Sequence, residues 1–378
     1  MIRKRILLAS LLKPVSDSRL YEKIGKSLAK LPQVEVHVAG FQSLTPADET
    51  NITFHPVFSF KRLSFGRFSA QKSFWDLISK IKPEVLIVAT HELLPVAWLY
   101  CKQSSCKMVY DVQENYFLNL TTQQVYPGVA GKALGQVVRE IEKIIAPSIN
   151  HFFLAEKAYA KELPFLGSRI TVIQNKYLPP SNSIKLEREV PVSIKDIKPL
   201  RLLYSGTISK LYGVLDAVNF TKQLRTWVPQ TELTIIGYCA DKKFLVELKK
   251  HIQHLPFVRL IGGDALVPHQ KILIQEQQHH IGLLPYHPHP STFTCIPTKL
   301  YEYIGNGLVV VAEENPLWAE ILQNSNAGIC HSFAKELTQA GVENLIRGTF
   351  YQNGIPEDVF WREEESKVQR VVLDLLEQ

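Results

Sequence analysis

Short apolar runs that alternate with amphipathic segments constrain this chain more than any other feature of its sequence. The runs span residues 5–12, 34–39, 84–89 and 107–111, then 201–205, 233–237, 258–263, 281–285 and 308–312. Such runs are typical of strands buried on both faces of a parallel sheet, and a segment such as 18–30 has helical periodicity. The alternation therefore predicts an α/β protein, with mostly parallel sheets that helices cover on both faces.

The chain is long enough for two domains. Its 378 residues exceed what one hydrophobic core usually serves. The clearest linker is rich in proline and serine and covers residues 177–183 and 190–199. We therefore predict a first domain over residues 1–178, a linker over 179–199, a second domain over 200–355 and a C-terminal helix over 356–378.

Composition and cysteine usage predict a cytoplasmic protein. Hydrophobic residues make up 46% of the chain and charged residues 21%, and no apolar run approaches the ~18 residues that a membrane span needs. The basic residues 3–5 precede an apolar run as in a signal peptide, but no convincing cleavage region follows, so we predict a first strand there. The 5 cysteines include no C-x-x-C pair and predict neither a disulfide framework nor a zinc site. A reducing cytoplasm is the expected compartment.

Positive charge is concentrated in the first half of the chain. Residues 1–180 carry 23 Lys and Arg against 14 Asp and Glu, whereas residues 181–378 carry 20 against 22. Residues 61–82 interleave basic and aromatic side chains, which would suit peripheral contact with an anionic membrane surface. The alternative is a loop followed by a core-packed helix with solvated lysines. We predict no nucleic-acid binding, because no recognition motif accompanies the charge.

Polar side chains follow the predicted strands of the first half. Asp17, His91 and Glu114 each come soon after a strand, and ligands of parallel sheets bind beyond the carboxyl ends of the strands. These three residues are therefore our candidates for catalytic groups. Each also has a structural interpretation, since Asp17 could pair with Arg19, His91 could cap its helix and Glu114 could be structural.

The segment from Pro297 to Val311 places a cation and a carboxylate three residues apart at the start of a predicted helix. Lys299, Glu302, Tyr303 and Asn306 share one face of that helix. Pro297 suits the first helical turn, and the glycines at 305 and 307 suit its end. The pair could be an ordinary exposed ion pair, or the polar face could seat a phosphorylated ligand at the helix N-terminus.

Two glycine turns are predicted at the edge of the second sheet. Residues 201–205 form a strand that enters the turn from Gly206 to Gly213, and the strand at 233–237 ends in Gly237. A glycine allows the backbone to approach a phosphate closely. Both turns should lie at the same edge, because the strands that precede them run in the same direction.

The segment 297–307 resembles the nucleotide-sugar site of GT-B glycosyltransferases, especially the family 4 type, in which P-x-K-x-x-E-Y-x-x-x-G precedes a strand. Further segments are similar: D-x-R at 17–19, H-x-L at 91–93, Y-D-x-H-E at 110–114 with Gln113 in place of histidine, and V-I-x-N at 172–175. The resemblance implies two Rossmann-like domains whose parallel sheets face a central cleft, and a last helix that packs back on the first domain. It also implies that Glu302 binds the donor ribose and that Lys299 lies near the diphosphate.

The chain departs from the family pattern at two places. In the family, the turn after the first strand of the second domain commonly reads G-R-x-x-x-x-K-G. This chain has Thr207 in place of the arginine and Tyr212 in place of the lysine, so Lys210 is the cation that could reach the diphosphate instead. The family often has a second glutamate eight residues before the first, where this chain has Thr294. The donor-binding residues that the resemblance implies are Gly206, Thr207, Lys210, Gly237, Thr294, Pro297, Thr298, Lys299, Leu300 and Glu302.

The resemblance implies transfer of a sugar from a nucleotide-diphosphate sugar to a glycan or lipid-linked acceptor. We expect no cofactor and no metal, because no D-x-D motif is present. If the reaction retains configuration, no general base is needed; if it inverts, Asp17, His91 or Glu114 would be the base. Two alternatives stay open, a nucleotide-sugar epimerase on the same fold and a non-catalytic relative. The expected location is the cytoplasm, with peripheral contact at the inner face of the membrane as an additional hypothesis.

Overall fold

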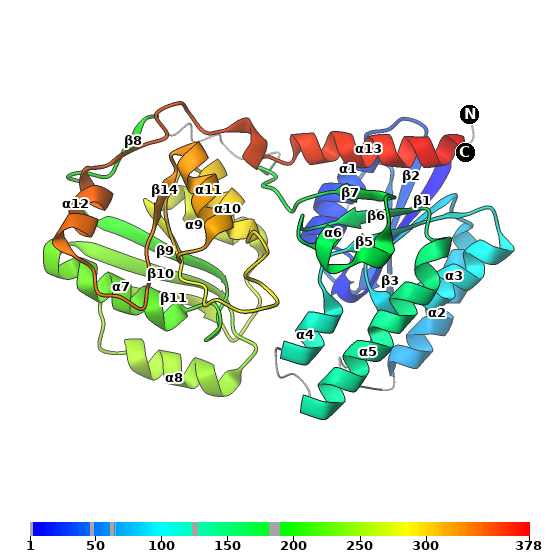
Figure 1. The fold of residues 1–378 in the computed structure, drawn as a ribbon, viewed down its shortest axis with the longest axis horizontal. Coiled ribbons are helices and arrows are strands. Elements are labelled where there is room, and N and C mark those ends of the chain that lie inside the picture. The colour runs from blue at the N-terminus through cyan, green and yellow to red at the C-terminus, as the bar shows by residue number, and fades with distance from the viewer. Residues whose placement is uncertain (1–2, 46–48, 61–63, 65, 123–127, 181–189) are drawn as a thin grey trace. The chain divides into compact units, whose positions relative to one another are not determined.

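The computed structural model describes residues 3–45, 49–60, 64, 66–122, 128–180 and 190–378. They form two compact units (Figure 1). The first unit comprises Met1–Asn175 and Trp361–Gln378, and the second comprises Lys176–Phe360. Part of the predicted linker 179–199 and part of the basic segment 61–82 lie outside the described residues.

The first unit is built on a sheet of 7 strands, all parallel, in the order β3-β2-β1-β4-β5-β6-β7. The central strands are apolar and almost completely buried, as strands covered on both faces must be. The strands are β1 (Lys4–Pro14), β2 (Val34–Phe41), β3 (Ile52–Phe58), β4 (Val85–Val88), β5 (Lys107–Val112), β6 (His151–Leu154) and β7 (Ile170–Val172).

Helices cover this sheet, and the C-terminal helix is one of them. Trp361 donates its Nε1–H to Ser27 Oγ at 2.9 Å, and Glu364 Oε2 accepts from the backbone N–H of Gln174 at 3.1 Å. The helices are η1 (Ser18–Gly25), α1 (Lys26–Ala29), α2 (Gly66–Ile81), η2 (His91–Leu93), α3 (Leu94–Gln103), α4 (Tyr116–Thr122), α5 (Gly128–Ile145), η3 (Ala146–Ser148), α6 (Tyr159–Glu162), η4 (Pro164–Leu166) and α13 (Arg362–Glu377).

The second unit has a sheet of 6 parallel strands in the order β11-β10-β9-β12-β13-β14. Its strands are β9 (Leu200–Thr207), β10 (Thr231–Tyr238), β11 (Val258–Gly263), β12 (Ile281–Leu284), β13 (Val309–Ala312) and β14 (Gly328–Cys330). A separate antiparallel pair joins β8 (Val192–Ser193) to β15 (Thr349–Phe350). The helices are α7 (Val214–Trp227), α8 (Lys242–Ile252), α9 (His269–Gln278), α10 (Thr298–Gly305), α11 (Pro316–Ser325), α12 (Gln339–Arg347) and η5 (Glu357–Val359).

Both sheets reverse their strand order beside their first strand. In the first unit the direction in which successive strands are added to the sheet changes between β1 and β4, and in the second unit it changes between β9 and β12. Connections leave such a point toward opposite faces of the sheet, which opens a crevice at the carboxyl ends of these two strands. Each unit therefore provides one place beyond the end of its sheet where a ligand could bind.

A row of glycines crosses the carboxyl end of the second sheet. Gly206 on β9 is in register with Gly237 on β10, which is in register with Gly262 on β11. A Cβ on Gly237 would lie 1.6 Å from the carbonyl oxygen of Gly206, so no larger residue fits between the strands there. The row leaves main chain, and no side chains, at this part of the sheet edge.

The predicted fold class is confirmed: the chain is an α/β protein with two mostly parallel sheets. The apolar runs did not predict β3, β6, β8, β14 and β15, because these strands are short or carry polar residues such as His55 and His151. The predicted helix over 18–30 forms as η1 and α1. Within the described residues, no helix combines the length and apolar character that crossing a bilayer requires.

Candidate functional site

Helix α10 and strand β9 position a group of charged residues in the second unit. The helix begins at Thr298, directly after Pro297, and ends where Gly307 adopts a φ of 68°. Strand β13 then starts at Val309, so the helix and strand predicted for 297–311 are confirmed. One face of α10 packs Leu300 and Ile304 into the core, and the opposite face carries Lys299 and Glu302.

The predicted pair of Lys299 and Glu302 forms, but it is not the exposed ion pair of the simpler interpretation. Lys299 Nζ contacts Glu302 Oε2, and it also lies 3.2 Å from Oε1 of Glu276 on α9. Glu276 is completely buried and Glu302 is only 2% exposed. One cation therefore lies between two buried carboxylates, and burial makes these contacts far stronger than those of a surface pair.

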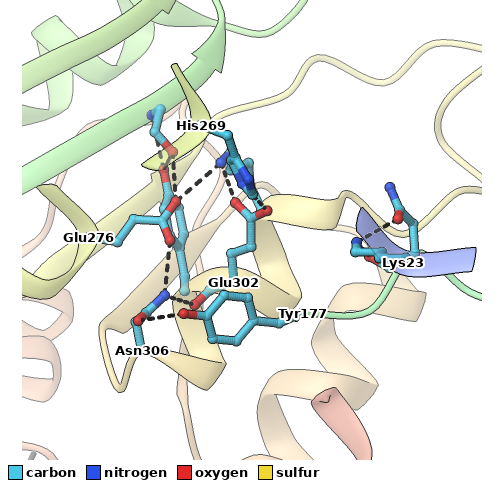
Figure 2. Close-up of polar contacts among 10 residues, drawn as sticks. Lys23, Tyr177, His269, Glu276, Glu302 and Asn306 are labelled. Atoms are coloured by element: carbon cyan, nitrogen blue, oxygen red, sulfur yellow. Dashed lines mark hydrogen bonds and ion pairs between the residues drawn. The ribbon is translucent and has the colours of Figure 1, made fainter. Parts of the chain in front are cut away.

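Three further side chains complete this cluster (Figure 2). His269 Nε2 lies 2.9 Å from Glu302 Oε1, and Asn306 donates one Nδ2–H to Glu276 Oε2 at 3.0 Å. Tyr177 donates its O–H to Asn306 Oδ1 at 3.1 Å. His269 and Lys299 both contact the carboxylate of Glu302, whereas Asn306 also donates its Nδ2–H to the backbone carbonyl of Glu302 at 2.9 Å (Figure 2).

Burial and charge shift the pKa values of the three central groups in different directions. Burial raises the pKa of Glu276 to about 8, with Lys299 acting against the shift and Glu302 adding to it. Burial also favours a raised pKa for Glu302, but Lys299 and His269 outweigh it and hold that pKa far below the ordinary value. Burial alone would lower the pKa of Lys299, yet the two carboxylates raise it. At neutral pH Lys299 is therefore protonated and Glu302 is ionised, whereas the carboxyl of Glu276 can hold a proton.

The glycine turn meets this cluster. A Cβ on Gly206 would lie 3.6 Å from Lys299 Cε, so the backbone at the end of β9 passes directly beside the lysine. Gly206 has a φ of 111°, which residues with a Cβ rarely adopt. The main chain at Gly206 and the ammonium of Lys299 thus lie together at the point where the strand order reverses.

The other predicted donor-binding residues lie around this point with different degrees of exposure. Thr207 and Thr294 are exposed, Pro297 and Thr298 are partly buried, and Leu300 is a core residue that could offer a ligand only its backbone. Lys210 Nζ pairs with Glu247 Oε2 at 3.0 Å and stacks over Phe244, both on α8. Lys210 therefore lies against α8 in this structure, and its predicted contact with a diphosphate stays a prediction.

Glu276 and His269 belong to the cluster although they were not predicted from the sequence. The signal for Glu276 was its position in α9, where it lies three and four residues after the buried Leu273 and Ile272. An acid within an apolar helical stripe is a polar group that needs a buried partner. His269 gave no such signal, because nothing local to residue 269 indicates that Glu302 lies nearby.

In the first unit, the D-x-R segment has a structural role. Asp17 caps η1 by accepting from the N–H groups of Arg19 and Leu20 at 3.0 and 2.9 Å. The guanidinium of Arg19 instead pairs with Asp111, with 2.6 Å between Nη2 and Oδ1. Asp17 does not line the cavity of the first unit that His91 and Glu114 line, and its catalytic role stays a prediction.

His91 and Glu114 both line a cavity of about 1090 Å³ in the first unit, at the carboxyl ends of β1, β4 and β5. His91 Nδ1 lies 3.4 Å from Glu92 Oε2, and Arg67 binds the other oxygen of Glu92 at 3.0 Å. Burial lowers the pKa of His91, so its imidazole is neutral at pH 7. Glu114 is exposed and accepts from Asn119 Nδ2 at 2.7 Å.

Of the basic segment 61–82, the structure describes Ser64 and residues 66–82. Helix α2 buries Phe74 and Ile78 in the core and exposes Lys72 and Lys80, as in the interpretation of a core-packed helix with solvated lysines. Phe68, however, is 76% exposed at the start of the helix. In the part of the chain that the structure describes, no group of His, Cys, Asp or Glu side chains is arranged to hold a metal ion.

The chain is a two-domain α/β protein with a charged cluster at the crevice of its second sheet. No family model and no curated protein matches the sequence. Solved structures match its fold over the full length. Sucrose-phosphate synthase from Thermosynechococcus elongatus has a TM-score of 0.63 at 13% identity, with 99% of each chain covered. HepE from Anabaena, solved in complex with UDP, has a TM-score of 0.61 at 14% identity, again with 99% of each chain covered.

A third similar structure is AviGT4, a glycosyltransferase involved in avilamycin A biosynthesis, with a TM-score of 0.55 at 12% identity over 99% of this chain and 97% of that one. These structures share the GT-B fold, and the chain therefore has this fold, as the resemblance in the segment 297–307 implies. At this level of identity the likeness establishes the fold, and the residues of the site must support any statement about function.

Proposed function

We propose that this chain is a glycosyltransferase that moves a sugar from a nucleotide-diphosphate sugar to a glycan or lipid-linked acceptor. The observation that carries the proposal is the buried cluster of Lys299, Glu302, Glu276 and His269 beside the glycine turn at Gly206. A buried cation beside the side-chain-free backbone of Gly206 suits a diphosphate, and a fixed, ionised carboxylate suits a pair of ribose hydroxyls. The GT-B neighbour from Anabaena was solved with UDP, which makes uracil the first base to test.

In the proposed reaction, the bond between the sugar C1 and the β-phosphate oxygen breaks, and both electrons leave with the diphosphate. The acceptor hydroxyl oxygen forms the new bond to C1 and gives up its proton. In a retaining reaction the departing diphosphate takes that proton; in an inverting one a base of the first unit takes it. Negative charge grows on the diphosphate as the bond breaks, so groups already directed at it lower the barrier.

Each residue of the cluster has a defined part in this proposal. Lys299 would neutralise the diphosphate as the leaving group, together with backbone N–H groups at Gly206, Thr207 and the first turn of α10. Glu302 accepts from Lys299 and His269 and retains lone pairs for two ribose hydroxyls. We propose a metal-independent reaction, because Lys299 already supplies positive charge where a bound cation otherwise would. We also propose that the reaction retains configuration, in keeping with the resemblance to family 4 glycosyltransferases.

On the acceptor side, His91 and Glu114 are the groups that line the cavity of the first unit. The neutral imidazole of His91 can accept a proton, so His91 is the base that we would expect in an inverting enzyme. We further propose that the protein works in the cytoplasm and contacts the anionic inner face of the membrane through residues 61–82. The exposed Phe68, Lys72 and Lys80 support this contact.

The test measures binding of UDP, GDP, ADP, CMP and TDP to the wild type and to Lys299→Met. A nucleotide well above its dissociation constant should stabilise the wild type by roughly 2–3 kcal/mol and the variant much less. Lys271→Met is the matched control, because Lys271 lies exposed on α9, beside the cluster. Donor interconversion without acceptor would instead indicate an epimerase. A stable fold that binds none of the nucleotides would contradict the proposal and favour a non-catalytic relative.

A further inference from the structure

The cavity of the first unit has walls of two kinds. Polar residues that follow β4 and β5 line one part of it, among them His91, Glu92 and Gln113. Helices α2, α3, α4 and α5 supply apolar residues, and α5 alone contributes Leu134, Val137, Val138 and Ile141. The strand ends therefore form a polar region and the helices form an apolar one within the same cavity.

Apolar side chains remain exposed where α5 lines this cavity. Val137 is 56% exposed and Leu134 is 38% exposed, and Phe68 of α2, which also lines the cavity, is 76% exposed. The cavity volume of about 1090 Å³ lies at the upper limit of ordinary ligand pockets, which measure about 300–1,000 Å³. It thus has room for more than one sugar ring and offers apolar surface that a purely polar glycan would leave exposed to water.

We infer that the acceptor is an amphiphile: a hydroxyl-bearing headgroup lies at His91, and a hydrocarbon chain lies along the apolar face of α5. This inference rests on the proposed function for the reaction and narrows its acceptor from glycans in general to lipid-linked ones. The chain-binding step itself depends only on the first unit. Apolar contact with Leu134 and Val137 would draw the chain out of water, and the headgroup would remain with the polar residues at the strand ends.

The geometry around His91 suits a headgroup hydroxyl. The ring lies edge to face with Tyr116 at 4.4 Å between centroids, and the tyrosine donates its O–H to the carbonyl of Ala89 at 3.2 Å. Glu92 lies beside Nδ1 and is itself fixed by Arg67. The imidazole therefore packs against Tyr116 and lies beside the Glu92–Arg67 pair at the polar region of the cavity.

The experiment titrates the full-length protein with hexyl, octyl and decyl β-D-glucoside, each below its micelle concentration. Transfer of a methylene from water into an apolar site is worth about fourfold in affinity, so we expect affinity to rise about two- to fourfold with each added methylene. Geranyl β-D-glucoside, with a branched isoprenoid chain, then distinguishes an isoprenoid carrier from a saturated lipid. Affinities that do not change with chain length would overturn the inference.

Two lysine substitutions on α5 provide the matched comparison. Val137→Lys places a charge in the cavity wall, whereas Ile144→Lys changes an apolar side chain on the same helix that is 70% exposed and outside the lining. We expect Val137→Lys to weaken decyl glucoside binding at least about tenfold and Ile144→Lys to leave it unchanged. An equal loss in both variants would contradict the assignment of the cavity, and Leu134→Glu repeats the test at a second wall position.

UDP titration of the same samples separates this inference from the proposed function. UDP binding with no dependence on chain length would overturn the inference and leave the glycosyltransferase proposal intact. Dependence on chain length with no nucleotide binding would support the cavity as a lipid site and count against the glycosyltransferase proposal.

Discussion

Replacing Glu276 by glutamine should remove a loss of stability that the wild-type chain suffers as the pH rises. Burial raises the pKa of this carboxyl from 4.5 to about 8. Between these values the folded chain holds a proton that the unfolded chain has lost, so the free energy of unfolding falls with increasing pH. Each pH unit costs at most about 1.4 kcal/mol, so the wild type should lose up to about 3 kcal/mol between about pH 6 and about pH 8.

Urea denaturation followed by tryptophan fluorescence measures this loss at several pH values. Glutamine keeps an oxygen that can accept from Asn306, but it does not titrate, so the Glu276→Gln curve should be flatter by about 2–3 kcal/mol over the same range. Glu320→Gln, on the exposed surface of α11, is the control and should follow the wild type. If Glu276→Gln loses as much stability as the wild type, the carboxyl is ionised throughout and the description of the cluster is wrong.

Three further perturbations test separate parts of the structure. Arg19→Met leaves Asp111 buried without its cation and should lower the free energy of unfolding by about 3–5 kcal/mol, measured by urea denaturation; a loss below about 1 kcal/mol would refute this pairing. Gly237→Ala forces its Cβ into the carbonyl of Gly206 and should destabilise the protein by at least about 2 kcal/mol in the same assay, and an unchanged midpoint would contradict the close approach. His91→Gln tests the retaining reaction: because the departing diphosphate takes the acceptor proton, the rate constant of transfer should fall less than about tenfold while nucleotide affinity, measured by calorimetry, stays constant, and a larger loss of transfer at unchanged nucleotide affinity would indicate an inverting reaction with His91 as its base.

Local patterns in the sequence predicted the elements that carry the candidate site. The apolar runs of the second half all form strands of one parallel sheet, and Pro297 and Gly307 mark the limits of α10 as expected. Gly206 and Gly237 end neighbouring strands, and their alignment follows from the parallel register. Periodicity, caps and turns depend on interactions between residues close in the chain, so the sequence shows them directly.

Contacts between distant residues were decided by the tertiary structure alone. Nothing near residue 302 in the sequence indicates that Glu276 and His269 of α9 share its environment, and nothing near Asp17 indicates that Arg19 reaches Asp111 instead. Lys210 likewise pairs with Glu247 of α8, although the family resemblance implied that it could reach the diphosphate.

The same distinction holds for the first unit. The sequence alone established an α/β chain with candidate polar groups after its strands, among them His91. The cavity that surrounds His91 exists because β1, β4 and β5 lie side by side and α2, α4 and α5 enclose the space beyond their ends. Strand order and helix packing arise from burial of apolar surface by the whole chain, so the environment of a side chain, its pKa and its partners emerge only in the folded protein.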